Sequence, residues 1–279
     1  MENRVDPAEY RRRKNEEKDR LFQKLNRCTE EIMQDEKAYQ RYLDTQAALD
    51  LYSVANTLLI ADRDIGATKL KSFSAWNRQG IQVKKGERGI LLFEPYEYID
   101  KEGNSHRDYR TKRVFDLSQT TGKAQRRFTD NLSERAVLKA LMTEAPVTVE
   151  VLNAVSESGE KEYSKSGQTI FVKKGLSAET LFQILAKEIC LADLSTEKEL
   201  SGKKREDISK TVSYLLCRRY GFQPASETMA MPEYMKNLGL KEVREELNQI
   251  RESFNRINGR VYANIEKKRV KNKERQGER

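Results

Sequence analysis

The stretch IQVKKGERGILLFEPYEYI, residues 81–99, predicts the β-hairpin around which the first half of the chain is organised. Gly86 and Gly89 frame a tight basic turn, and the aliphatic and aromatic run over residues 90–99 is typical of a strand. Residues 100–104 are rich in turn formers, and residues 105–117 return as a second strand that ends in VFDL. Together these segments predict an antiparallel pair.

Helical patterns precede the hairpin. Residues 8–50 predict one or two helices, because an apolar stripe runs between interleaved opposite charges. Residues 46–62 form the most apolar helix candidate of the first half, and residues 70–80 predict a short helix that Gly80 ends. The apolar stripes consist of Leu21, Leu25, Ile32 and Tyr39 in the first segment and Leu51, Val54, Leu58 and Leu59 in the second.

A polar segment, residues 118–131, follows the hairpin and predicts a domain boundary. The segment SGKKRED, residues 201–207, is expected to be a loop between two helices, and a basic tail closes the chain. The predicted fold class is α+β, with an N-terminal helical extension, a small domain of helices and antiparallel sheet, and a mostly helical domain with a small sheet. The helices expected after the boundary are residues 133–143, 177–193, 206–220 and 233–266, and the strands are residues 147–152 and 169–172.

The charge of the chain favours an anionic partner. Its 279 residues carry a formal net charge of +9. Residues 51–130 hold 15 basic and 10 acidic side chains, net +5, and residues 225–279 hold 13 and 9, net +4. Lysine and arginine neutralise phosphates, so nucleic acid is one interpretation. Simple solubility is the other.

The cysteines and the lack of long apolar runs predict a cytoplasmic protein. Cys28, Cys190 and Cys217 have no metal-binding spacing and cannot pair completely, as expected of free thiols in a reducing compartment. No apolar run has the length of a membrane span, and the first residues contain no apolar signal segment. The single histidine, His106, excludes any site that needs two.

Cations and aromatic rings alternate closely over residues 69–115. Single-stranded nucleic acid is bound by cations that follow phosphates and by rings on which bases stack. On the expected return strand, Arg107, Tyr109 and Arg113 share one parity with Phe115 and so project from one face. The alternative is that the large rings form core. The predicted nucleic-acid-binding residues are Lys69, Lys71, Phe73, Trp76, Arg78, Lys84, Lys85, Arg88, Arg107, Tyr109 and Arg113.

These motifs resemble the N-terminal domain of the ArdC family of antirestriction proteins, and they are similar to LtrC-like proteins of conjugative elements. The resemblance rests on NTLLI (residues 56–60), Ala67–Thr68, Phe73, Trp76, VKKGERGI (83–90) and VFDLSQT (114–120). It departs at Asp62–Arg63–Asp64, where the family more often has glutamine and proline. It implies that residues 45–122 bind single-stranded DNA without strong sequence preference, in the service of a mobile element.

A second resemblance points to a zincin-like metallopeptidase domain. GQTIFVKKGLSAETLFQILAKEICLADL, residues 167–194, resembles its strand and active helix, and residues 209–222 resemble the helix that supplies a third ligand. A zincin carries H-E-x-x-H, two histidines on one helical face and a glutamate that activates water. Here Lys187, Glu188, Leu191 and Lys210 occupy the matching positions, so the resemblance implies a degenerate site without metal, cofactor or peptidase activity.

Two alternatives concern the residues left at that site. Lys187 or Lys210 is expected to neutralise Glu188 in place of a metal. Cys190 and Cys217 fall on the two facing helices, where two thiolates with Glu188 would form a different site, although small buried thiols are the simpler interpretation.

Three functions follow in order of preference. The first is a single-stranded DNA-binding protein with an inactive peptidase-like domain, the second a protein-interaction scaffold of a conjugative element, and the third an active metallopeptidase. Single-stranded DNA is the expected partner, other proteins of the element are the alternative, and no membrane is expected. The predicted division is residues 1–44 (charged helical extension), 45–122 (DNA-binding domain), 131–232 (degenerate peptidase-like domain) and 233–279 (C-terminal helix and basic tail).

Overall fold

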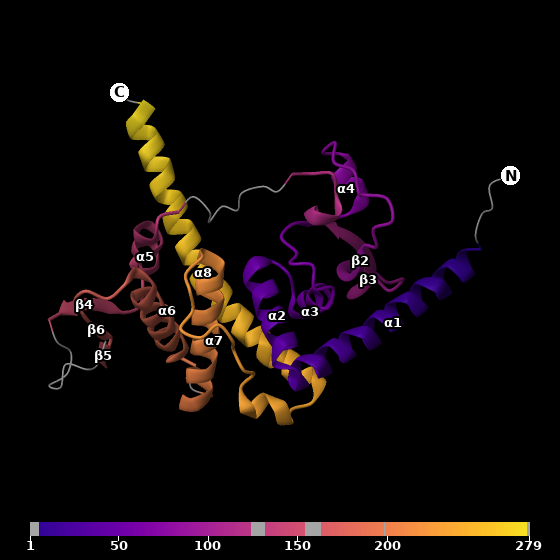
Figure 1. Ribbon diagram of the computed structural model, residues 1–279. Helices are drawn as coiled ribbons and strands as arrows, with labels where there is room; N and C mark the ends of the chain where they lie inside the picture. Colours follow the sequence, from indigo (N-terminus) through magenta and orange to yellow (C-terminus); the bar gives the residue numbers. More distant parts are fainter. Residues whose placement is uncertain (1–5, 124–131, 154–162, 198, 278–279) are drawn as a thin grey trace. The chain divides into compact units, whose positions relative to one another are not determined.

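The computed structural model describes residues 6–123, 132–153, 163–197 and 199–277 (Figure 1). The chain divides into two compact units. The first unit comprises residues 1–125 and 233–245, and the second comprises residues 126–232 and 246–279. Each unit combines helices with one three-stranded sheet, which confirms the predicted α+β class.

Three helices open the first unit: α1 (Pro7–Gln34), α2 (Glu36–Ala48) and α3 (Val54–Ala61). Asp35 separates the first two, because its side chain accepts a hydrogen bond from the backbone N–H of Lys37 and starts α2. The prediction of one helix over residues 46–62 is wrong. Ser53 caps a new helix, and Leu51, which was expected on a buried stripe, is 88% exposed in the intervening turn.

The predicted hairpin is confirmed. Strand β2 (Ile90–Ile99) pairs antiparallel with β3 (Ser105–Asp116), from Ile90 opposite Val114 to Ile99 opposite Ser105. A short strand that the sequence did not reveal, β1 (Leu70–Lys71), pairs with the other edge of β3, so the order is β1-β3-β2. Helix α4 (Phe73–Asn77) lies between β1 and β2 in the chain and is followed by Gly80, whose φ is 70°.

The carboxylate of Asp116 joins the ends of these strands. It is 1% exposed and accepts hydrogen bonds from the backbone N–H groups of Thr68 (2.7 Å), Lys69 (2.9 Å) and Ser118 (2.8 Å). The side chain of Gln119 accepts from the backbone N–H of Asp116, which closes a capping box on the 3-10 helix η1 (Leu117–Gln119). Buried polar groups need such partners, so these bonds explain the DLSQ part of the motif at residues 114–120.

The ring of Trp76 forms the core beneath the sheet. It is fully buried against Phe115 and Leu117, and its Nε1–H donates to the carbonyl of Phe115 at 2.9 Å. Such a bond satisfies the polar atom of an otherwise apolar ring. Trp76 is therefore a structural anchor of the first unit.

Asn56 on α3 covers the open edge of β2. Its side-chain amide donates to the carbonyl of Phe93 at 2.8 Å and accepts from the backbone N–H of the same residue at 2.9 Å. Unpaired groups on an edge strand invite pairing with other chains, and this side chain occupies two of them. It also fixes α3 against the hairpin.

The second unit contains a mixed sheet of order β4-β6-β5. Strand β4 (Thr148–Leu152) runs parallel to β6 (Thr169–Lys173), and β5 (Tyr163–Ser166), which the sequence did not predict, runs antiparallel to it. Its helices are α5 (Glu134–Met142), α6 (Ala178–Leu194), α7 (Gly202–Tyr220) and the larger part of α8 (Leu240–Gly277).

Helix α7 begins earlier than expected. The prediction of a loop over residues 201–207 is wrong, because the Ser201 hydroxyl accepts a hydrogen bond from the backbone N–H of Lys204 and caps the helix. Gly221, with φ of 78°, ends it. A short 3-10 helix, η3 (Glu233–Asn237), then belongs to the first unit.

Replacing Asn56 with alanine should destabilise the first unit by about 1–3 kcal/mol, because it leaves two backbone groups of Phe93 without their partner. Trp76 is the single tryptophan of the chain, so its fluorescence during urea unfolding reports on this unit. Asn77→Ala, at an exposed position of α4, serves as the control and should change stability by less than about 0.5 kcal/mol. Equal effects of the two variants would contradict the role of Asn56.

Candidate nucleic-acid interface and degenerate metal position

The basic turn at residues 84–89 is held from below by buried side chains. The Gln119 amide donates to the Glu87 carboxylate at 2.8 Å and to the carbonyl of Arg88 at 3.1 Å. Lys84 is tied twice, by its backbone N–H to the carbonyl of Gln119 and by its Nζ to that of Ser118. Of the two predicted lysines in the turn, Lys84 is thus partly engaged within the fold.

Three exposed cations gather at this turn. Lys85 and Arg88 are exposed on it, and Gly89 brings the turn against β3, since a Cβ there would lie 2.6 Å from Cγ of Arg113 and 2.9 Å from the carbonyl of Val114. Arg113 is exposed beside it. Arg63, which the sequence did not single out, donates to the carbonyl of Arg88 at 3.4 Å. Together these side chains make a positive surface.

Lys71 and Arg78 lie in a different place. They line a hollow of about 510 Å³ beside Leu92, Glu94 and Lys112 of the hairpin. The ammonium of Lys71 stands 5.2 Å from the centroid of the Trp76 ring. Hydrogen bonds from Lys112 and Arg110 lower the pKa of Glu94, so this hollow contains a stable negative charge next to its cations.

The aromatic rings predicted at the interface differ in how far they are exposed to solvent. Trp76 is 0% exposed and cannot stack on a base, so its assignment to the interface is corrected to the core. Phe73 is 54% exposed and packs edge-on against Phe115, with centroids 6.4 Å apart. Lys69 contributes its backbone N–H to Asp116.

Arg107 and Tyr109 lie on the hairpin, where both line a groove of about 490 Å³ with Phe22 of α1. Tyr109 is 44% exposed. The structure therefore separates the eleven predicted residues within the first unit. Four lie at the turn (Lys84, Lys85, Arg88 and Arg113), two at the hollow (Lys71 and Arg78), two at the groove by α1 (Arg107 and Tyr109) and one in the core (Trp76), while Lys69 and Phe73 lie in none of these places.

In the second unit, α6 and α7 bring together Lys187, Glu188 and Lys210, the residues that the predicted degenerate site assigns to these two helices. Nζ of Lys187 lies 2.7 Å from Oε1 of Glu206 and 4.0 Å from Oε1 of the buried Glu188, and Nζ of Lys210 lies 3.6 Å from Oε1 of Glu206. The expected pairing of Glu188 with a lysine is made by Lys187. The sequence did not predict the role of Glu206, which lies one turn before Lys210 on α7 and forms ion pairs with both Lys187 and Lys210.

These residues do not fit a zincin metal site. Ammonium groups repel a divalent cation, and the partly buried Leu191 has no lone pair to donate. Burial raises the pKa of Cys190 and of Cys217 to about 12, which fits the simpler interpretation of both as small buried thiols. Among the described residues, no group of three or more histidines, cysteines and acids is placed to hold a metal ion.

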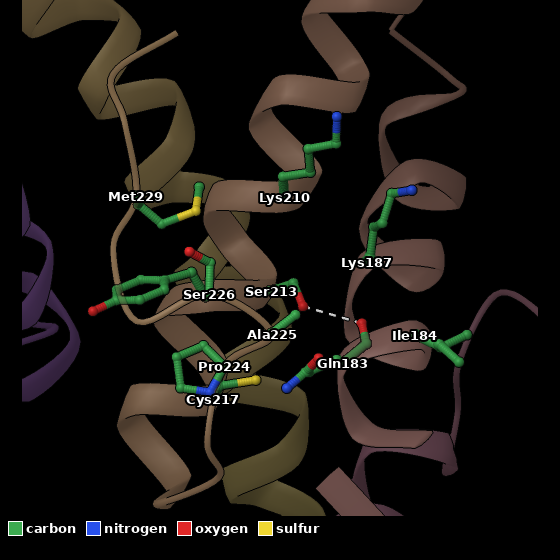
Figure 2. A pocket seen from close by; sticks show the side chains of 11 residues that line it. Gln183, Ile184, Lys187, Lys210, Ser213, Cys217, Pro224, Ala225, Ser226 and Met229 are labelled. Atoms are coloured by element: carbon green, nitrogen blue, oxygen red, sulfur yellow. Dashed lines mark hydrogen bonds between the residues drawn. The ribbon is translucent and has the colours of Figure 1, made fainter. Parts of the chain in front are cut away.

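An apolar pocket of about 270 Å³ adjoins these lysines. Figure 2 shows Lys187 and Lys210 at one end of it, while Cys217 and Pro224 lie toward the other end. The Ser213 hydroxyl donates to the carbonyl of Gln183 at 3.0 Å and is thereby occupied within the wall. The pocket therefore combines a mainly apolar lining with two cationic side chains at one end.

Solved structures of the antirestriction protein ArdC from plasmid R388 resemble this chain. The Mn(II)-bound structure matches with a TM-score of 0.52 and 16% identity over 77% of this chain and 85% of that one. The chain has an ArdC-like fold. The metal-free structure of the same protein matches with a TM-score of 0.49, 16% identity and coverage of 77% and 86%.

This fold is the part of the predicted resemblance that is confirmed. No family model matches the sequence, and no curated protein is significantly similar to it. Within the residues that the structure describes, no helix is both long and apolar enough to cross a bilayer.

Lys187→Met and Glu206→Gln should show a coupling energy of about 1 kcal/mol in a double-mutant cycle, because the two side chains are only 22% and 34% exposed. Native-state hydrogen exchange of peptides from α6 and α7 measures this coupling energy within the second unit. The more exposed pair Lys210 and Glu206 is the comparison and should couple by only about 0.3 kcal/mol. The reverse order would show that Lys210 is the main partner of Glu206.

Proposed function

We propose that this protein binds single-stranded DNA through its first unit, without strong sequence preference. The observation that carries the proposal is the exposed cation cluster of Lys85, Arg88 and Arg113 on a turn that buried hydrogen bonds hold in place. Fixed cations attract phosphates at little cost in side-chain entropy. Exposed rings elsewhere in the same unit supply surfaces on which bases stack.

The ArdC-like fold supports this proposal and suggests its setting. The protein of similar fold is an antirestriction protein of a plasmid. A related role here is the protection of an incoming single strand during transfer of a mobile element, in the cytoplasm of the recipient. Nonspecific binding suits that role, since the strand to be protected has no fixed sequence.

We further propose that the second unit has no peptidase activity. The ArdC of plasmid R388 has been solved with Mn(II). The positions that the resemblance assigns to metal ligands are occupied in this chain by Lys187, Leu191 and Lys210. The ammonium of Lys187 lies beside the carboxylates of Glu188 and Glu206. A site of this composition favours an internal ion pair over a metal and its bound water.

A scaffold for protein partners is the second candidate, and the apolar pocket beside these lysines favours it. A peptidase-like domain without metal retains a surface for binding a polypeptide. Stable co-purification of a protein, together with failure of the chain to bind single-stranded oligonucleotides at low salt, would support the scaffold over the DNA-binding function.

Neutralising the turn in a Lys85→Gln, Arg88→Gln variant should weaken binding of single-stranded DNA. Two lost phosphate contacts should reduce the slope of log K against log salt by about 1.4. Fluorescence anisotropy with a labelled oligonucleotide across a salt series measures both quantities. Lys236→Gln, Lys241→Gln, at exposed positions of the same unit, is the matched control. An unchanged slope in the turn variant would remove the turn from the binding site.

Restoring ligands should create a metal site that the natural chain lacks. Lys187→His and Leu191→His place two imidazoles on one face of α6, and Lys210→Glu adds a carboxylate from α7. We expect the triple variant to retain about one zinc ion per chain after dialysis, and the natural protein to retain almost none. Elemental analysis by mass spectrometry measures the zinc content of both proteins. Stoichiometric zinc or manganese in the natural protein would contradict the proposed inactivity.

A further inference from the structure

The groove of the first unit at α1 is walled by two aromatic rings on a shared floor. Phe22 of α1 and Tyr109 of β3 are 42% and 44% exposed. Both pack on Phe93, with ring centroids 4.5 Å and 6.2 Å from it. Rings that are exposed and yet supported from below offer stacking surfaces at low conformational cost.

Two polar side chains that line the groove, Asn56 and Ser53, already form hydrogen bonds within the fold. Asn56 bonds both backbone groups of Phe93, and the Ser53 hydroxyl accepts from the backbone N–H of Asn56. The Asn56 amide is therefore not placed to read the hydrogen-bonding edge of a base. A ligand in the groove meets mainly ring faces and aliphatic surface, which suits bases of any identity.

The charge of the groove is positive. No aspartate or glutamate is among the described residues that line it, and Arg107 provides an exposed guanidinium. Glu97 stands directly opposite Arg107 in the hairpin register and is an acid that would compete with a phosphate at that guanidinium. A stacked ring next to a guanidinium matches a nucleotide, with its flat base and its anionic phosphate.

We propose that this groove holds one unpaired base of bound single-stranded DNA between Phe22 and Tyr109, with the adjoining phosphate at Arg107. This assignment rests on the DNA-binding function proposed above and adds the subsite that receives the base. Arg107, Tyr109 and Arg113 share one face of β3, so the groove and the basic turn lie about 20 Å apart along the same strand. A short single strand can thus contact both.

The test measures binding of the full chain to a labelled 12-mer of thymidines and to the same 12-mer with abasic sites. Tyr109→Ala and Phe22→Ala should each weaken binding of the thymidine strand about 10-fold, and the preference for bases over abasic sites should shrink. Tyr98→Ala is the matched control, because that ring is 45% exposed on the opposite face of the same hairpin. It should stay within about twofold of the natural protein.

Two charge variants test the phosphate contact. Arg107→Gln should reduce the salt slope by about 0.7 while leaving the preference for bases over abasic sites intact. Glu97→Gln removes the competing acid and should strengthen binding. Emission of the buried Trp76 shows whether each variant is folded, and Phe22→Ala, on the exposed face of α1, carries the test if Tyr109→Ala unfolds.

The outcomes separate the two proposals. If the natural chain fails to bind the thymidine strand at low salt, the DNA-binding function is wrong. If it binds, but Tyr109→Ala and Phe22→Ala leave both affinity and base preference unchanged, the groove assignment alone is overturned. Self-association in sedimentation velocity that Phe22→Ala abolishes would also overturn it, and would assign the groove to a second copy of the chain.

Discussion

The first unit depends on the buried carboxylate of Asp116. Burial removes water from a charge, and three backbone N–H groups compensate for that loss. Because these donors belong to residues on either side of the hairpin in the chain, the acid ties β1, the end of β3 and the following turn to one point. Gln119 extends the network to the basic turn. The cations of the candidate interface are thus positioned by a buried network beneath them.

In the second unit, a lysine compensates the charge of a buried acid. Glu188 is 4% exposed, and a buried acid without a partner is costly. The ammonium of Lys187 lies 4.0 Å from Oε1 of Glu188 and 2.7 Å from Oε1 of Glu206, so it supplies positive charge beside both acids. The pair of Lys187 with Glu206 also links α6 to α7. Under the proposed inactivity of this unit, such an ion pair takes the place of the open coordination position on which metal-assisted hydrolysis depends.

Burial divides the aromatic residues of the first unit into two groups. Trp76 uses its ring for the core and its N–H for the carbonyl of Phe115, so nothing of it remains for a ligand. Phe22 and Tyr109 instead share the support of Phe93 and keep about two fifths of their surface exposed. A ring contributes to recognition only when it is both exposed and held in place.

The hairpin, the start of α6 at Ser177 and the exposure of Lys85 and Arg88 could be predicted from the sequence, because alternation, caps and glycine turns depend on neighbouring residues. The strands β1 and β5 could not, since two to four residues carry too little pattern. The burial of Trp76, the ring pair of Phe22 and Tyr109, and the contact of Glu206 with Lys187 were decided only by tertiary structure. Each depends on which distant segment packs against a side chain, and that information is not contained in local sequence.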